Sequence, residues 1–219
     1  MARRTESVAF EGFPDEAFEF YEGLRADNSK TYWTAHKHVY DDCVRAPMLA
    51  LLESLAPTFA GTPSIFRPYR DVRFSPDKSP YKTAQGGFLE VAHGLGYWMQ
   101  LDADGIMVGG GFHAHDKPQT ARFRAAVDGD ASGRALATIV DKLTKGGYDV
   151  GGAAVRTRPR GVSADHPRLD LMRHESLTVS QRLDPADCVA SDFAKRLTTH
   201  WRAVAPLVNW CQQYAAPSA

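Results

Sequence analysis

The chain has 219 residues, 43% of them hydrophobic and 24% charged, and its 26 basic residues balance 26 acidic ones. This composition is ordinary for a soluble globular protein, and the length suits one domain with a good core. A nucleic-acid-binding domain usually carries an overall basic excess, so the balanced charge argues against nucleic acid as a partner while leaving room for a local basic patch.

Cysteine usage and the N-terminal sequence favour a cytoplasmic protein. Cys43, Cys188 and Cys211 are widely spaced and form no CxxC pair, so we expect reduced thiols and no disulfide framework. The opening residues M-A-R-R-T-E-S lack an apolar core segment, and no stretch is long enough to span a bilayer, so neither a signal peptide nor a membrane partner is expected. Without repeats or linkers, we predict a single domain over residues 1–219, with an ordered core of about 10–214.

The N-terminal part is predicted to be helical. Residues 12–16 resemble a helix entry, with proline and acidic residues in the first turn, and an apolar stripe then runs to about Arg25. After a break at Asp27 and Asn28, Ser29 is suited to cap a second helix that extends to Ala56. Pro47 should kink or split that helix, because proline lacks the amide donor.

The most unusual stretch is the basic segment, residues 66–83, which reads F-R-P-Y-R-D-V-R-F-S-P-D-K-S-P-Y-K-T. It sets five cations against only two acids, Asp71 and Asp77, the cations being Arg67, Arg70, Arg73, Lys78 and Lys82. Its first half alternates like an extended strand, and Pro68 would place that strand at a sheet edge. The following S-P-D-K-S-P is typical of a turn.

Three interpretations of the basic segment are open. Guanidinium groups bind carboxylates and phosphates with two parallel hydrogen bonds, and lysine adds a mobile charge, so the segment could hold an anionic ligand. Asp71 and Asp77 could instead balance the arginines internally, in an ion-pair network that ties a strand to its turn. The third interpretation is a nucleic-acid surface.

The rest of the chain indicates an antiparallel sheet with further helices. Strands are predicted near residues 86–91, 97–102 and 106–112, the last two joined by an Asp104-Gly105 hairpin signal. Further strands are expected at 148–156 and 175–183. Helices are expected at 117–127, 132–145 and 167–174, and in a last region from Asp184 with a kink or break at Pro206. The predicted fold class is therefore α+β, a mainly antiparallel sheet of about 4–6 strands packed with N-terminal and C-terminal helices.

Two histidine-containing segments were considered for chemistry. His113 and His115 would share one face of a strand and could offer two imidazoles to a metal, although no third ligand stands at a fixed spacing. Asp165 and His166 resemble the start of an acid-base pair, but capping of the helix at 167–174 by Asp165 is the favoured interpretation.

Several of these residues carry a resemblance. They are Asn28 with Tyr32 and Trp33, the whole basic segment, Gly96 with Tyr97, Arg158 to Gly161, and Asp165 to Pro167. Together they resemble the bacterial and fungal family catalogued as domain of unknown function 2461, over about residues 10–210. The resemblance implies no activity, cofactor or catalytic residue. Arg160 stands where similar proteins are expected to have lysine, and the His113 to His115 segment is not part of the family's pattern.

The leading hypothesis is a pocket on the basic segment that binds a small phosphate- or carboxylate-bearing molecule. Arg67 and Arg73 would grip the anion, Lys78 and Lys82 would neutralise it, and Asp71 would orient an arginine. The full set of expected ligand-binding residues is Arg67, Tyr69, Arg70, Asp71, Arg73, Lys78, Tyr81, Lys82 and Arg160.

Whether the protein is an enzyme is left open. His166, which with Arg160 would close the pocket, and Asp77 are the candidates for proton transfer. Phosphate-loop, dinucleotide-binding, HExxH and nucleophile-elbow motifs are absent from the sequence, and no cofactor is predicted. The alternatives are a non-enzymatic module in which the basic segment is a buried ion-pair staple, and weak nucleic-acid binding.

Overall fold

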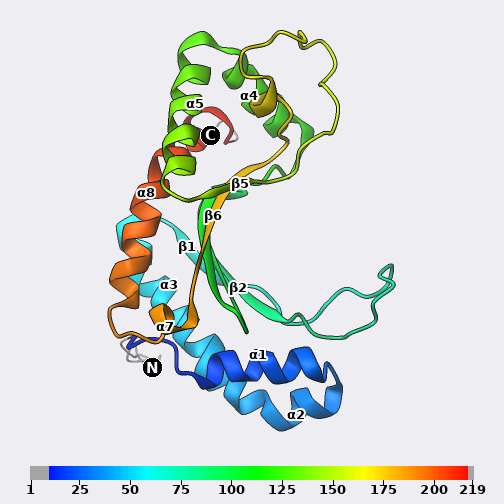
Figure 1. Ribbon diagram of the computed structural model, residues 1–219, viewed down its shortest axis with the longest axis vertical. Helices are drawn as coiled ribbons and strands as arrows, with labels where there is room; N and C mark the ends of the chain where they lie inside the picture. The colour runs from blue at the N-terminus through cyan, green and yellow to red at the C-terminus, as the bar shows by residue number, and fades with distance from the viewer. Residues whose placement is uncertain (1–9, 217–219) are drawn as a thin grey trace, which may run out of the picture. The chain divides into compact units, whose positions relative to one another are not determined.

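The computed structural model describes residues 10–216 (Figure 1). The residues on which the signal-peptide expectation rests lie outside this range. The described residues divide into two compact units. Unit 1 comprises 10–89, 98–107 and 182–198, and unit 2 comprises 90–97, 108–181 and 199–216. The single domain expected from the sequence stays a prediction.

A six-stranded antiparallel sheet confirms the predicted α+β class. The strand order is β1-β2-β3-β4-β6-β5. The strands are β1 (Thr62–Ile65), β2 (Ala84–Ala92), β3 (Leu95–Asp102), β4 (Gly105–Phe112), β5 (Asp149–Gly151) and β6 (Leu177–Leu183). The predicted hairpin between β3 and β4 is present, but its turn residues are Ala103 and Asp104, one position earlier than the expected Asp104 and Gly105. Gly105 has φ of +121°, a conformation that favours glycine, and an added Cβ would lie 2.2 Å from the Leu183 carbonyl oxygen.

Helices make up most of the rest of unit 1. They are α1 (Glu16–Ala26), α2 (Lys30–Val39), the π-helix η1 (Tyr40–Arg45), α3 (Ala46–Phe59), α7 (Pro185–Cys188) and the start of α8 (Phe193–Tyr214). Ser29 caps α2 as predicted, since its Oγ accepts a hydrogen bond from the Tyr32 amide at 3.1 Å. The split predicted at Pro47 takes the form of η1, in which the Ala46 amide donates to Asp41 five residues back.

The core of unit 1 is rich in aromatic side chains. The Phe20 ring packs edge-on against Trp33, with centroids 5.8 Å apart, and lies 5.9 Å from Tyr40. The next layer comes from α3, where Met48, Leu51 and Leu52 are buried. These contacts fix the position of α1 and α2, which carry residues of the site described below.

Unit 2 contains α4 (Lys117–Asp128), α5 (Asp130–Lys145), α6 (Leu169–Met172) and the rest of α8. Asp116 caps α4 by accepting a hydrogen bond from the Gln119 amide at 2.7 Å. Phe123 on α4 stacks on Phe112 and meets Trp210 edge-on, with centroids 5.5 and 5.9 Å apart.

Three predictions for the C-terminal half were wrong in detail. The strand expected at 148–156 is interrupted: it pairs with β6 over Asp149–Gly151, Gly152 turns the chain with φ of +105°, and only an isolated β-bridge between Ala154 and His174 follows. The helix expected at 167–174 is shorter, and its N-cap is Arg168 with no side-chain cap, so Asp165 does not cap it. Pro206 does not break α8, because buried apolar residues on both sides of the proline, such as Val204 and Val208, hold the helix; a kink at Pro206 stays a prediction. Of the helices within residues 10–216, none combines the length and apolar character that crossing a bilayer requires.

Candidate functional site

The basic segment forms an extended arm between β1 and β2 (Figure 1). The strand expected over residues 66–74 is not present. The pairing there is a single isolated β-bridge between Tyr69 and Tyr81. The Arg70 amide donates to the Pro80 carbonyl at 2.9 Å and the Lys82 amide to the Pro68 carbonyl at 2.8 Å. Prolines 68, 76 and 80 have no amide donor, so a longer ladder cannot form. We call residues 66–83 the arm.

Buried contacts anchor the base of the arm. Asn28 hydrogen-bonds both backbone groups of Tyr81, at 3.0 and 3.1 Å. The Tyr81 ring stacks on Trp33 with centroids 4.3 Å apart and an interplanar angle of 8°. Buried Gln85 donates to the Phe66 carbonyl at 2.8 Å and accepts from the Tyr40 hydroxyl at 2.8 Å. Part of the sequence motif therefore holds the arm in place.

The two acids of the arm each take one arginine. Arg73 contacts Asp71 with Nε at 3.0 Å and Nη2 at 2.7 Å, and the role of Asp71 in orienting an arginine for a ligand stays a prediction. Arg70 pairs with Asp77. Both carboxylates are largely exposed, and exposed ion pairs contribute little to stability. These two ion pairs therefore contribute little to the stability of the arm.

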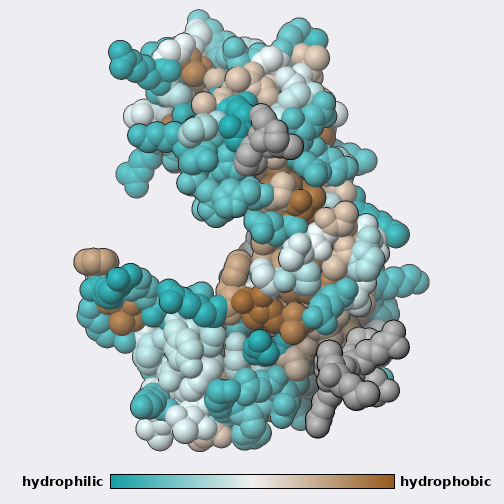
Figure 2. Space-filling view, turned by 180° about the vertical axis from the view of Figure 1, so that it is seen from behind, coloured by the Kyte–Doolittle hydropathy of each residue, from teal (hydrophilic) through white to brown (hydrophobic). Residues whose placement is uncertain are grey.

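The other cations of the arm form no ion pair among residues 10–216; they are Arg67, Lys78 and Lys82, of which Arg67 lies near enough to help lower the pKa of Asp71. Lys78 donates to the Val72 carbonyl at 2.9 Å, and the Lys82 ammonium lies 5.9 Å from the Phe66 ring centroid. The surface of the arm is mostly hydrophilic, with hydrophobic side chains toward its end, where Phe74 is 94% exposed (Figure 2). The positive surplus predicted from the sequence is present in the folded chain.

A cavity of about 580 Å³, which we call the arm pocket, opens at the base of the arm. It is lined by Arg25, Asn28, Phe66, Arg70, Asp77, Ser79, Tyr81, Lys82, Thr83, Ala84, Gly86 and Gln100. Of the residues expected to bind ligand, Arg70, Tyr81 and Lys82 line this pocket. The others on the arm, namely Arg67, Tyr69, Asp71, Arg73 and Lys78, lie outside its lining.

Sequence reasoning did not include several polar side chains that line the arm pocket, namely Arg25, Asn28, Ser79, Thr83 and Gln100. Arg25 lies in the last turn of α1 and forms an ion pair with Asp104 at 3.0 Å. Gln100 alternates with buried residues along β3, so its exposure could have been predicted, but its position beside the arm could not.

Asp77 is held in its ionised form. The Ser79 hydroxyl and amide donate to its Oδ1 at 2.6 and 2.8 Å, and Arg70 contacts its Oδ2. The Ser79 hydroxyl and the Arg70 guanidinium together hold the pKa of the Asp77 carboxyl far below its usual range. A carboxyl group of such low pKa is a poor proton donor or acceptor near neutral pH, and the role of Asp77 in proton transfer stays a hypothesis.

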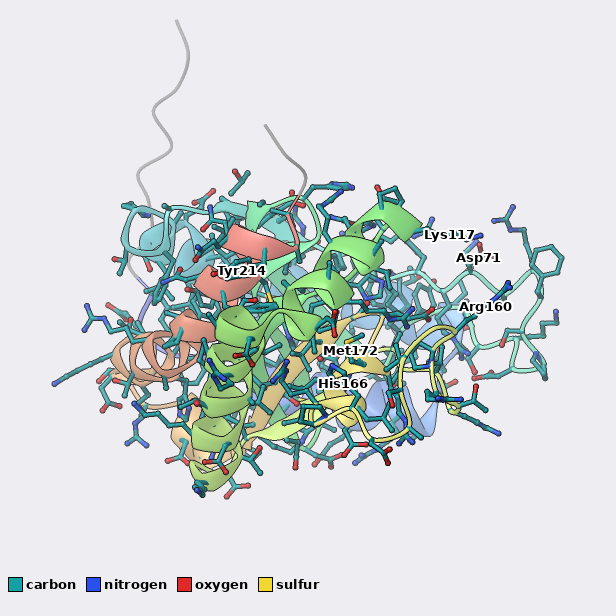
Figure 3. The ribbon with its side chains drawn as sticks, turned by 90° about the horizontal axis from the view of Figure 1, so that it is seen from above. Asp71, Lys117, Arg160, His166, Met172 and Tyr214 are labelled. Carbon is teal, nitrogen blue, oxygen red and sulfur yellow. The ribbon has the colours of Figure 1, made fainter. Side chains whose placement is uncertain are left out.

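Arg160 and His166 belong to unit 2, where both line a separate cavity (Figure 3). Both ring nitrogens of His166 are engaged there, Nδ1 with the Arg168 amide at 3.1 Å and Nε2 with Asp128 at 3.2 Å. This arrangement favours a structural role for the ring. That Arg160 and His166 close the arm pocket, or that His166 moves a proton, stays a prediction.

The histidines considered as metal ligands form a small cluster in unit 2. The ring centroids of His113 and His115 are 5.7 Å apart, and His93, which sequence reasoning did not include, lies 4.4 Å from His115. Within residues 10–216, no group of three or more histidine, cysteine, aspartate or glutamate side chains could hold a metal ion.

The fold and the arm define an α+β protein with an antiparallel sheet, one edge of which continues into a cationic arm. A family model described as "Conserved hypothetical protein (DUF2461)" matches residues 16–210. The chain therefore belongs to this family, as its motifs indicated. A search of curated proteins found no match.

Proposed function

We propose that the protein binds a small phosphate- or carboxylate-bearing molecule in the arm pocket. The observation that carries this proposal is the position of Lys82, which lines the cavity and has no carboxylate partner among the described residues. Two further cations line the same cavity and are each paired with a carboxylate, Arg25 with Asp104 and Arg70 with Asp77. Asp77 is the carboxylate of the lining, and Asp104 lies outside it. The lining thus has a net positive charge.

The chemistry of the lining suits a small organic anion. Lys82 supplies a mobile charge, and Arg70 retains N–H groups beyond the one that it gives to Asp77. Thr83 and Gln100 offer a hydroxyl and an amide, and Phe66 supplies an aromatic wall. A volume of about 580 Å³ is within the range of small-molecule sites. The sequence suggested that Arg67 and Arg73 grip the anion. In this proposal Arg70 and Lys82 grip it instead, because they line the cavity.

The test is thermal denaturation with inorganic phosphate and a panel of carboxylates, at constant ionic strength set with chloride. A ligand that binds only the folded state stabilises it by about 2.7 kcal/mol at a hundred times its Kd. We expect anions to raise the Tm of the wild type and to raise it less in Lys82→Ala. Lys78→Ala is the matched control, because Lys78 is on the same arm but outside the cavity lining. Equal melting of the wild type with and without every anion would refute the proposal.

One observation favours weak nucleic-acid binding as a second candidate. Phe66, Tyr69 and Phe74 are exposed on the same arm as the unpaired cations, and exposed aromatic rings next to cations are typical of single-strand binding surfaces. Fluorescence anisotropy with a single-stranded oligonucleotide should then show an affinity that falls steeply with salt and is weakened by Phe74→Ala. Absence of binding at low salt would remove this candidate.

The structural module is the competing hypothesis. It expects Arg67→Ala with Arg73→Ala to unfold the protein, whereas the ligand hypothesis expects the double variant to stay folded. Arg73 and Asp71 are 77% and 44% exposed in their side chains, which supports the second expectation. The unfolding midpoint of the double variant decides between them.

A further inference from the structure

Unit 2 contains a cavity of about 750 Å³, which we call the loop pocket. One wall is α4, which contributes Arg124, Ala125 and Asp128, and Met172 at the end of α6 adds to it. The other wall is the loop from Val155 to His166. Figure 3 shows Arg160 on this loop, with His166 and Met172 nearby.

Arg124 places a partly buried guanidinium group in this wall. Its Nε donates to the Met172 carbonyl at 3.0 Å. Its Nη2 is buried and has no hydrogen-bond partner within residues 10–216. A buried, charged donor without an acceptor is costly, so such groups are found mainly where an acceptor can reach them. Because Nη2 is closed to solvent, an anionic oxygen in the loop pocket would reach it only if the side chain shifts.

Two further guanidinium groups line the same cavity from the loop. Arg158 donates to the Val162 carbonyl at 2.7 Å, which braces the loop from within. Arg160 is exposed and forms no ion pair with any described residue. The carboxylate in the lining, Asp128, lies against His166 at 3.2 Å. The three arginines therefore outnumber the acid, which is already engaged.

The loop is fixed to α4 by contacts at the end of that helix. Arg168 donates to the carbonyls of Val127 and Asp128 at 2.7 and 2.9 Å, and cationic donors at a helix C-terminus are favourable. The His166 side chain is only 11% exposed, and its Nδ1 accepts the Arg168 amide, so Nε2 carries the proton that is donated to Asp128. The wall opposite Arg124 is thus held by hydrogen bonds of the fold.

We propose that the loop pocket is a second binding site, which takes an organic phosphate. Three guanidinium groups match a phosphate better than a carboxylate, because a phosphate monoester offers three anionic oxygens and up to two charges. Val155, Val162 and Met172 supply apolar surface for the organic part of the ligand. The site shares no residue with the arm pocket, so it does not depend on the function proposed above.

The test is titration calorimetry with phenyl phosphate, in a Lys82→Ala background that disables the arm pocket. We expect Arg160→Ala to weaken binding about tenfold or more, as loss of a charge-assisted contact does. Arg156→Ala is the matched control, because Arg156 is an exposed arginine of the same loop outside the cavity lining. Arg124→Gln should weaken binding as well, and circular dichroism checks that this variant is folded. If Arg124→Gln does not fold, the result for Arg160→Ala tests the proposal.

Three results would overturn the proposal. The first is no binding at millimolar phenyl phosphate, and the second is an equal loss in Arg160→Ala and Arg156→Ala. The third is binding of phenol as tight as that of phenyl phosphate, since the phosphate would then contribute nothing. A ligand lost from Lys82→Ala but kept by Arg160→Ala would support the arm pocket and count against the loop pocket, so the two proposals can fail separately.

Discussion

Asn28 pairs with the backbone of Tyr81 as a neighbouring strand would. Its Nδ2 donates to the Tyr81 carbonyl at 3.0 Å, and its Oδ1 accepts from the Tyr81 amide at 3.1 Å. The connection between α1 and α2 therefore holds the base of the arm, 53 residues further along the chain. The family motif therefore contains two kinds of residue, those that anchor the arm and those that give it positive charge.

Substitution of this anchor should destabilise the fold. Asn28→Ala leaves two backbone groups of buried Tyr81 without partners, so we expect the free energy of unfolding to fall by about 2 kcal/mol. Chemical denaturation measures it. Asn209→Ala, on an exposed position of α8, is the control and should change stability by no more than about 0.5 kcal/mol. Equal effects of the two substitutions would show that the pairing carries no stability.

The Asp77 carboxyl should respond to Ser79 more than to any other neighbour. The Ser79 hydroxyl is the largest cause of its lowered pKa, so Ser79→Ala should move the pKa of Asp77 up toward its ordinary value. Because the folded-state pKa is lowered, the associated stability is present above the unfolded pKa and is lost as pH falls through the folded one. Carboxyl NMR titration measures the shift. The pKa of Asp71, which is lowered mainly by Arg73, should not move in this variant.

A glycine in α5 should be intolerant of alanine although it is helical. The Cβ of Gly133→Ala would lie 2.1 Å from the Val127 carbonyl oxygen and 2.4 Å from Arg168 Nε, where Arg168 reaches the end of α4. Alanine gains about 1 kcal/mol in helix propensity, but overpacking costs about 1–3 kcal/mol, so we expect a net loss of stability. Gly151→Ala, whose Cβ would lie 3.6 Å from its nearest neighbour, is the control in thermal denaturation. A raised Tm in Gly133→Ala would contradict the close approach.

The three cysteines should differ in reactivity. Burial raises the pKa of the Cys188 thiol to about 12, and Cys211 is also fully buried with a raised pKa. Cys43 is only partly buried. Because the thiolate is the reactive form, a thiol reagent at neutral pH should modify Cys43 first and the other two only after unfolding. Rapid modification of Cys188 in the native protein, measured by mass spectrometry, would contradict this order.

Most elements could be predicted because their signals are local. The Ser29 cap, the hairpin between β3 and β4, and the apolar side of α8 each depend on residues a few positions apart. The failures were of another kind. Alternation over the basic segment predicted a strand, but alternation does not supply a pairing partner, and Asp165 precedes a helix that begins only after Arg168.

The candidate site divides in the same way. The excess of cations in the basic segment was visible in the sequence, and Arg160 and His166 were identified there as candidate site residues. The importance of Arg124 was not, because it looks like any other cation on an amphipathic helix until Met172 and the loop lie against it.

The amino-acid sequence by itself determined where the positive charge of the arm is and where several helices begin, as at Ser29, since capping, turn formation and charge act over a few neighbours. Only the tertiary structure decided which cations face a cavity. Arg70 and Lys82 face one because Asn28 and Trp33 hold Tyr81 in place, whereas Arg73 stays on the exposed arm with Asp71. A cavity needs walls from segments far apart in the chain, and their approach depends on packing that local sequence patterns do not encode.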